Sequence, residues 1–158
     1  MATRALIGYL DEDRNFTCTY NHYDGYPEGL GKSLLNHYDT DEKAKQIANT
    51  GYISSVDDDG TIDSKYDEPA NKMKLNGDWE DAKEEMAGKV DEYGGNYGYI
   101  WFEGEGAWTT LKNHGIRSMM DQLDDKMSLA ASMFGPVDEN KKEEEMKEIE
   151  ENYNTKWN

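Results

Sequence analysis

The sequence predicts an α+β fold in which two β-hairpins form a small antiparallel sheet that packs against helices. Two pairs of segments rich in β-branched and aromatic residues, each pair joined by a polar loop, indicate the hairpins. Apolar residues at helical spacing, between and after these segments, indicate the helices. A chain of 158 residues suits one domain with its own core. We expect a core domain over residues 1–115 and a helical extension over residues 116–158.

Residues 4–10 and 16–23 are the two predicted strands of the first hairpin, on either side of a polar loop. Alternate side chains of a strand point to opposite faces of its sheet. In the second strand this places four side chains on one face, and we expect that face to line the core. They are Phe16, Cys18, Tyr20 and His22.

Two short helices are predicted next, over residues 27–38 and 40–49. Pro27 suits the first position of a helix, because an N–H is not needed there. Apolar side chains follow at helical spacing. Asp39 and Glu42 resemble a capping box for the second helix, and Gly51 is its predicted C-cap.

Residues 51–77 are rich in Asp, Ser, Asn and Gly, which predicts a long surface segment with one short strand. A helix is predicted over residues 78–93, because Asp78 is a suitable N-cap and an apolar stripe follows it. Two glycines at 94 and 95 end this helix.

The second hairpin is predicted over residues 97–102 and 107–112, with Trp101 and Trp108 near its turn. After it, apolar residues repeat at helical spacing over residues 116–134 and predict a helix. Residues 138–158 would form a helix with few apolar side chains to bury. A stripe that thin is typical of a helix that is loosely docked or depends on a partner.

The chain is strongly acidic, with a formal net charge of -17 at pH 7 that is spread along its length. Such a charge repels nucleic acid and anionic membranes, so we expect no direct binding to either. Solubility or a salt-adapted host is one explanation of the charge, and attraction to a basic protein surface is the other. The sequence also lacks an apolar run long enough to cross a membrane, and its single Cys18 is consistent with a reducing compartment.

The first part of the chain resembles a family of small, largely uncharacterised bacteriophage and prophage proteins. The resemblance rests on a His-Tyr-Asp-Gly-Tyr turn at residues 22–26, where the family usually has Trp in place of Tyr23. It also rests on Gly31-Lys32, on His37-Tyr38 and on an Ile-Ser-Ser stretch at residues 53–55. It covers roughly residues 3–112. It implies a phage origin and an α+β fold, and it supplies no established activity. Since the sequence shows neither a membrane span nor the pattern of a signal peptide, we expect a location in the host cytoplasm.

Three arrangements of residues resemble sites of known chemistry. Gly31-Lys32-Ser33 resembles the end of a phosphate-binding loop, but the earlier glycine of that motif falls at Tyr26. Asp57, Asp59 and Asp63 have the rhythm of a calcium loop, and we favour a solvated acidic turn with weak calcium binding as the alternative. Cys18 and His22 are too far apart along one strand to share a metal ion or to act as a catalytic pair. We therefore predict no catalytic residue, no metal site and no cofactor.

The turn at residues 22–26 is the predicted centre of a binding surface. Its tyrosines either complete the core or form an exposed patch that anchors a partner. The first functional hypothesis is an acidic, non-enzymatic phage protein that binds a basic surface of a host protein and acts as a nucleic-acid mimic or an inhibitor. The alternative is a binder or hydrolase of nucleotides at a pocket around residues 22–33, and a third possibility is a virion component. The candidate binding residues are His22, Tyr23, Asp24, Tyr26, Lys32, Trp101 and Trp108.

Overall fold

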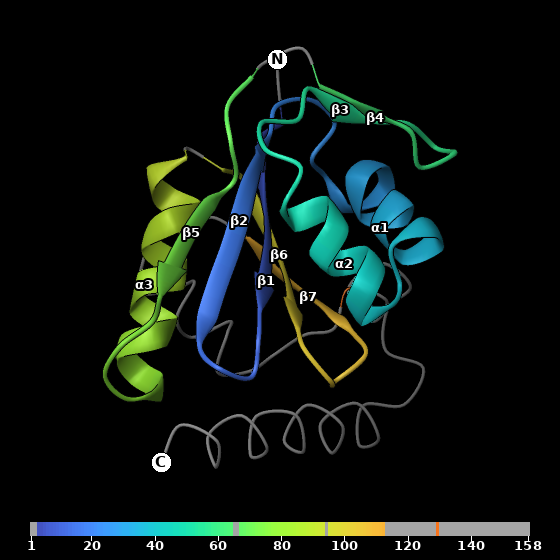
Figure 1. The fold of residues 1–158 in the computed structure, drawn as a ribbon. Coiled ribbons are helices and arrows are strands. Elements are labelled where there is room, and N and C mark those ends of the chain that lie inside the picture. Colours follow the sequence, from blue (N-terminus) through green and yellow to red (C-terminus); the bar gives the residue numbers. More distant parts are fainter. Residues whose placement is uncertain (1–2, 65–66, 94, 113–128, 130–158) are drawn as a thin grey trace.

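A computed structural model of the chain describes residues 3–64, 67–93, 95–112 and 129. Its main feature is a five-stranded sheet with helices on both faces (Figure 1). The strands are β1 (Ala5–Leu10), β2 (Asn15–Asn21), β5 (Asn71–Lys74), β6 (Tyr97–Phe102) and β7 (Trp108–Lys112), in the order β5-β2-β1-β6-β7. The helices are α1 (Lys32–His37), α2 (Asp41–Ala48) and α3 (Trp79–Glu92), and β3 (Ser55–Val56) pairs with β4 (Ile62–Asp63) in a separate small sheet.

The α+β class and both predicted hairpins are confirmed, but the sheet is mixed and not antiparallel. β1 pairs antiparallel with β2, and β6 pairs antiparallel with β7. The two hairpins join through a parallel pairing of β1 with β6. β1 is buried at all six positions, as expected for a central strand that is covered on both faces. The helical connection before β6 allows the parallel pairing, because parallel neighbours need a crossover and cannot be joined by a tight turn.

The fifth strand, β5, lies in the segment that was predicted to be mostly irregular. It pairs antiparallel with the first half of β2 and forms one edge of the sheet. Its sequence is Asn-Lys-Met-Lys, in which both lysines are exposed. Lysines protect an edge strand from pairing with other chains, but they also remove the apolar alternation by which a strand is recognised. The prediction of one short strand over residues 51–77 was therefore wrong, because β3, β4 and β5 all lie there.

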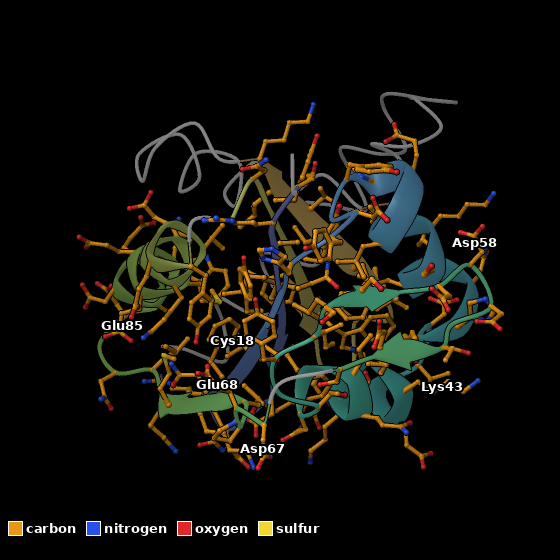
Figure 2. All side chains as sticks on the ribbon, turned by 90° about the horizontal axis from the view of Figure 1, so that it is seen from above. Cys18, Lys43, Asp58, Asp67, Glu68 and Glu85 are labelled. Carbon is orange, nitrogen blue, oxygen red and sulfur yellow. The ribbon has the colours of Figure 1, made fainter. Side chains whose placement is uncertain are left out.

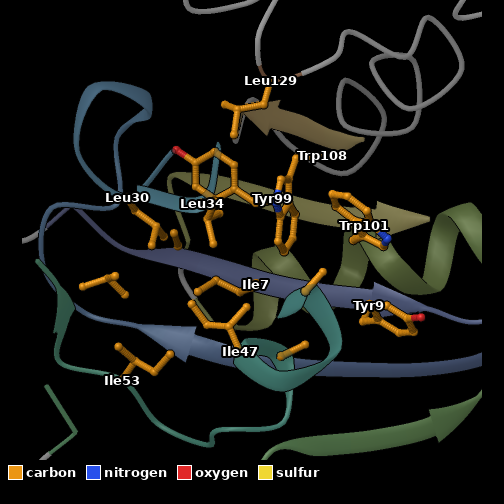
Figure 3. Packing of buried hydrophobic residues seen from close by; sticks show 14 residues of the cluster. Ile7, Tyr9, Leu30, Leu34, Ile47, Ile53, Tyr99, Trp101, Trp108 and Leu129 are labelled. Atoms are coloured by element: carbon orange, nitrogen blue, oxygen red, sulfur yellow. The ribbon is translucent and has the colours of Figure 1, made fainter. Parts of the chain in front are cut away.

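The sheet separates two apolar clusters, one against α3 and one against α1 and α2. Phe16 and Cys18 point to the α3 side and are fully buried, as the alternation in β2 predicted, whereas Tyr20 and His22 are only partly buried. Figure 3 shows the second cluster, where Tyr99, Trp101 and Trp108 of the second hairpin meet side chains from both short helices.

The predicted helix over residues 27–38 is present in two parts. Pro27–Gly31 forms one turn of π-helix, and α1 follows directly. A Cβ on Gly29 would lie 2.6 Å from the carbonyl oxygen of Asp24, so this wide turn depends on glycine. This π-turn leads the chain from the turn after β2 into α1.

The structure confirms the positions of the other two helices, with two corrections to the caps of α2. The side chain of Thr40, and not that of Asp39, caps α2 by accepting a hydrogen bond from the backbone N–H of Lys43. Its C-cap is Asn49, and not Gly51. In α3, Asp78 and Asp81 form a reciprocal capping box. The prediction of Asp78 as the N-cap is confirmed.

The helices predicted over residues 116–134 and 138–158 lie outside the described residues, with the exception of Leu129. This residue is fully buried in the cluster beside α1 and is labelled in Figure 3. A Cβ on Gly31 would lie 3.1 Å from its Cδ1 atom. Leu129 is therefore part of the core.

Candidate binding surface

The turn at residues 22–26 is fixed to the sheet by its backbone. The N–H of Gly25 donates to the carbonyl oxygen of Thr3 at 2.8 Å, and the hydroxyl of Tyr99 donates to the carbonyl oxygen of Gly25 at 2.6 Å. A Cβ at position 25 would lie 2.7 Å from the Thr3 oxygen, so only glycine fits this close approach. Asp24 has a φ of 56°, a left-handed conformation that Asp tolerates better than most residues. The turn is therefore held in one conformation.

The segment after α2 continues the pairing of β2 and places Tyr52 beside this turn. The N–H of Ile53 donates to the carbonyl oxygen of Tyr20 at 2.7 Å. The N–H groups of His22 and Tyr23 then donate to the carbonyl oxygens of Ile53 and Ser54, at 3.0 and 2.8 Å. Two parts of the chain that are distant in sequence thus meet at the end of β2.

Five aromatic rings gather at this end of the sheet, and we name them the aromatic strip. Its members are Tyr20, His22, Tyr23, Tyr52 and Tyr93. The His22 and Tyr23 rings meet edge to face with centroids 4.4 Å apart. The Tyr20 and Tyr52 rings are 4.8 Å apart, and Tyr93 at the end of α3 lies 6.1 Å from Tyr20. These separations are typical of aromatic pairs that stabilise one another.

The strip is ordered by hydrogen bonds, and two of its tyrosines are held in the neutral form. The hydroxyl of Tyr20 and Nδ1 of His22 are 2.7 Å apart, and Nδ2 of Asn71 donates to the Tyr93 hydroxyl at 3.0 Å. Burial raises the pKa of Tyr20 and also that of Tyr93, since the phenolate form loses hydration. Both phenols therefore stay protonated and neutral at physiological pH.

The strip is open to solvent at one end and is flanked by carboxylates. Tyr23 is 52% exposed and Tyr26, in the same turn, is 38% exposed. Some exposed carboxylates are sequence neighbours of the strip residues. Glu68 is brought near by backbone pairing, because the Tyr52 N–H donates to its carbonyl oxygen at 3.0 Å. Figure 2, seen from above, shows Glu68 beside β5. The flanking acidic residues are Asp24, Asp67, Glu68 and Glu92. Two basic residues also lie near the strip, namely Arg4, whose charge acts on Tyr20, and Lys89, which is paired with Glu92 at 2.9 Å.

The structure brings four of the seven predicted binding residues together in this turn. His22 is partly buried, and Tyr23, Asp24 and Tyr26 are exposed. Lys32 is exposed at the start of α1. Tyr52 and Tyr93 were not predicted as members, because their nearness to the turn depends on pairings between distant segments and leaves no local signal.

Trp101 and Trp108 do not belong to a binding surface, and that prediction was wrong. Each is 1% exposed, and their rings meet edge to face at 5.4 Å. Nε1 of Trp101 donates to Oδ1 of Asp41 at 2.7 Å, and Nε1 of Trp108 donates to the carbonyl oxygen of Tyr38 at 2.9 Å. One partner lies in α2 and the other directly after α1, so the two rings can be buried without an unpaired donor.

The start of the π-turn offers little to a phosphate group. The N–H groups of Gly29 and Gly31 both donate to the carbonyl oxygen of Tyr26, at 3.0 and 3.4 Å. The N–H of Leu30 donates to the carbonyl oxygen of Asp24 at 2.9 Å, and Pro27 has no N–H. Backbone donors that would cradle a phosphate are thus used within the turn.

The acidic turn between β3 and β4 is held against α1 by its carbonyl groups. The side chains of Ser33 and His37 contact the Asp57 and Asp58 carbonyl oxygens at 3.0 and 2.8 Å, and the Tyr38 hydroxyl donates to that of Gly60 at 2.6 Å. Within the described ranges, no three His, Cys, Asp or Glu side chains are grouped so that they could hold a metal ion. The structure therefore does not gather Asp57, Asp59 and Asp63 into a calcium site.

Fold and surface together describe an acidic α+β protein with helices on both faces of a mixed sheet and a tyrosine-rich turn at one end. No family model matches the chain, and neither a curated protein nor a solved structure matches it. The similarity to the phage family thus stays a prediction. Of the helices in the described residues, none combines the length and the apolar character that crossing a membrane requires.

Proposed function

We propose that this protein is a non-enzymatic accessory protein of phage origin that binds a basic surface of a host protein. One observation carries the proposal. An ordered group of aromatic rings ends in a half-exposed Tyr23 and is flanked by exposed carboxylates, on a chain with a net charge of -17. Tyrosine is enriched among the residues that dominate binding at interfaces, and a negative field speeds association with a positive partner.

The alternative activities receive less support from the same region. Burial raises the pKa of the Cys18 thiol to about 12, so that a thiolate nucleophile does not form near neutral pH. The N–H groups of the π-turn donate to backbone oxygens, which argues against a nucleotide site around residues 22–33. A basic surface that handles nucleic acid is the partner class that fits best, since the acidic protein would occupy it in place of phosphates.

Affinity capture tests this proposal. The full chain, attached to beads, is incubated with bacterial lysate at 50 mM and at 300 mM salt, and bound proteins are identified by mass spectrometry. We expect one or a few basic proteins at low salt and a marked loss at high salt, because screening weakens interactions between exposed charges. Beads that carry polyglutamate control for simple cation exchange. Recovery of the same proteins on both kinds of bead, or of none on the protein beads, would contradict the proposal.

A further inference from the structure

We infer that the aromatic strip is the docking surface for arginine side chains of a basic protein segment. This inference rests on the proposed function and adds the chemistry of the partner. It follows from two features of the strip, namely the exposed ring of Tyr23 at its open end and the carboxylates that flank it.

The first feature is the shape of the open end. The Tyr23 ring is 52% exposed and stands nearly perpendicular to the His22 ring, at 82°. His22 in turn lies almost parallel to Tyr52, with an angle of 29° between the two rings. Tyr23 thus offers exposed ring surface to a planar group, next to a second aromatic ring. The turn that carries both rings is fixed by backbone hydrogen bonds, so little ordering entropy is lost on binding.

The second feature is the charge around the rings, where the four flanking carboxylates outnumber the two basic groups named above, one of which is paired with Glu92. A cation over an aromatic face is attracted by the negative face of the ring. Asp24 is exposed beside Tyr23, and Glu68 is exposed on the segment paired with Tyr52. These carboxylates add attraction for a cation and repel a phosphate or a nucleobase carried on a phosphate chain. A basic peptide therefore fits this surface better than a nucleic acid does.

The choice of arginine over lysine follows from geometry. The guanidinium group is planar, stacks on aromatic rings and can donate two parallel hydrogen bonds to a carboxylate. The ammonium group of lysine is more strongly hydrated and has no plane to stack. A surface that combines rings with carboxylates thus favours arginine.

Titration of the full chain with two peptides tests the inference. The probes are capped hexapeptides, one of six arginines and one of six lysines, and binding is measured by calorimetry and by NMR at 25 mM salt. We expect the arginine peptide to bind more tightly than the lysine peptide and to shift the Tyr23 ring signals. Tyr23→Leu should weaken the arginine peptide roughly 2- to 5-fold, the range for an exposed cation–π contact, whereas Tyr23→Phe should not.

A charge-matched pair of variants separates the strip from the net charge. Asp24→Asn and Asp58→Asn remove the same charge, and Asn tolerates the left-handed conformation of residue 24. Asp58 lies in the turn between β3 and β4, on the opposite side of the view from Glu68 (Figure 2). We expect Asp24→Asn to weaken arginine binding more than Asp58→Asn does, with NMR spectra showing that both variants are folded.

The outcomes distinguish the inference from the proposed function. Failure of both peptides to bind at low salt would count against the proposed function itself. Binding that is equally affected by the two Asp→Asn variants and unaffected by Tyr23→Leu would overturn the strip as the docking surface, and the proposed function would stand. Equal affinity for the two peptides would overturn the choice of arginine.

Discussion

Single residues set the conformation of the turns that join the layers of this protein. Gly60 is an example, because its φ of 87° is in the left-handed region and a Cβ would lie 2.7 Å from the ring of His37. That ring also bonds the carbonyl oxygen of Asp58 at 2.8 Å. One missing side chain therefore allows the β3–β4 turn to lie against α1.

We expect Gly60→Ala to destabilise the protein by about 2 to 4 kcal/mol, which combines the cost of a left-handed alanine with that of overpacking. Gly106→Ala is the matched control, because Gly106 has a φ of 69° and nothing within 4 Å of its added Cβ. The control should lose only about 1 to 2 kcal/mol. Urea unfolding followed by circular dichroism measures both, and equal losses would show that contact with His37 does not matter.

The buried thiol of Cys18 predicts how stability depends on alkaline pH. Burial raises its pKa from 9.0 to about 12 in the folded protein. The unfolded chain releases this proton more readily, so the contribution to stability is complete below pH 9 and falls as the pH rises toward 12. Several tyrosines with raised pKa values add to the same trend.

Cys18→Ala shows how much of this pH dependence of stability comes from the thiol. We expect the free energy of unfolding of the natural chain to fall between pH 9 and pH 12, and to fall less steeply in the variant. Urea titrations at several pH values in this range give the two slopes. The variant is expected to be less stable at pH 7, because a cavity replaces the sulfur, so the comparison concerns slopes and not absolute values. Parallel curves would contradict the raised pKa.

Helices and hairpins are joined by a few side chains that reach between elements. Oδ1 of Asp41, in the first turn of α2, accepts hydrogen bonds from Nε1 of Trp101 at 2.7 Å and from the N–H of Gly104 at 3.1 Å. It therefore ties α2 to the hairpin formed by β6 and β7. In the same layer, α1 holds the β3–β4 turn through the side chains of Ser33 and His37.

Loss of the Asp41 carboxylate should leave the indole N–H of Trp101 buried without this acceptor. We expect Asp41→Ala to cost about 1 to 3 kcal/mol and to change the near-ultraviolet signal of tryptophan. Asp41→Asn keeps the acceptor oxygen and should cost less. Glu42→Ala, at the next and exposed position of the same helix turn, controls for the helix dipole. If Glu42→Ala lost as much stability as Asp41→Ala, the role of the Asp41 hydrogen bonds would be contradicted.

At the scale of the whole molecule, the protein has a large negative net charge. Many of the carboxylates are exposed, including those of the β3–β4 turn and of α3. Like charges repel one another more strongly in the compact state than in the expanded chain. Added salt weakens this repulsion, and at 0.1 M it largely screens exposed charges that are more than about 10 Å apart.

We therefore expect the melting temperature to rise as salt increases from 10 mM to 300 mM. A gain of about 1 kcal/mol corresponds to roughly 2 to 4 °C for a chain of this size. Calorimetry in sodium chloride and in choline chloride should give the same rise, since only ionic strength matters. A decrease, or a rise in one salt alone, would mean that general repulsion is not the cause.

Local patterns in the sequence were enough to predict both hairpins, the helices α1, α2 and α3, and the α3 cap at Asp78. These features depend on side chains within a few residues of one another, such as the alternation in β2 or the spacing of apolar residues in α3. The turn at residues 22–26 was also recognised, because Asp24, Gly25 and Pro27 each favour a particular backbone conformation.

Only the tertiary structure decided how these elements meet. The parallel pairing of β1 with β6, the edge strand β5 and the burial of Trp101 and Trp108 all depend on contacts between distant parts of the chain. So does the aromatic strip, to which Tyr52 and Tyr93 come from different segments. The physical reason is that a strand edge can pair with many other strands, and an aromatic ring can pack against many other rings, with similar energy. The packing of the whole core determines which of these partners is used.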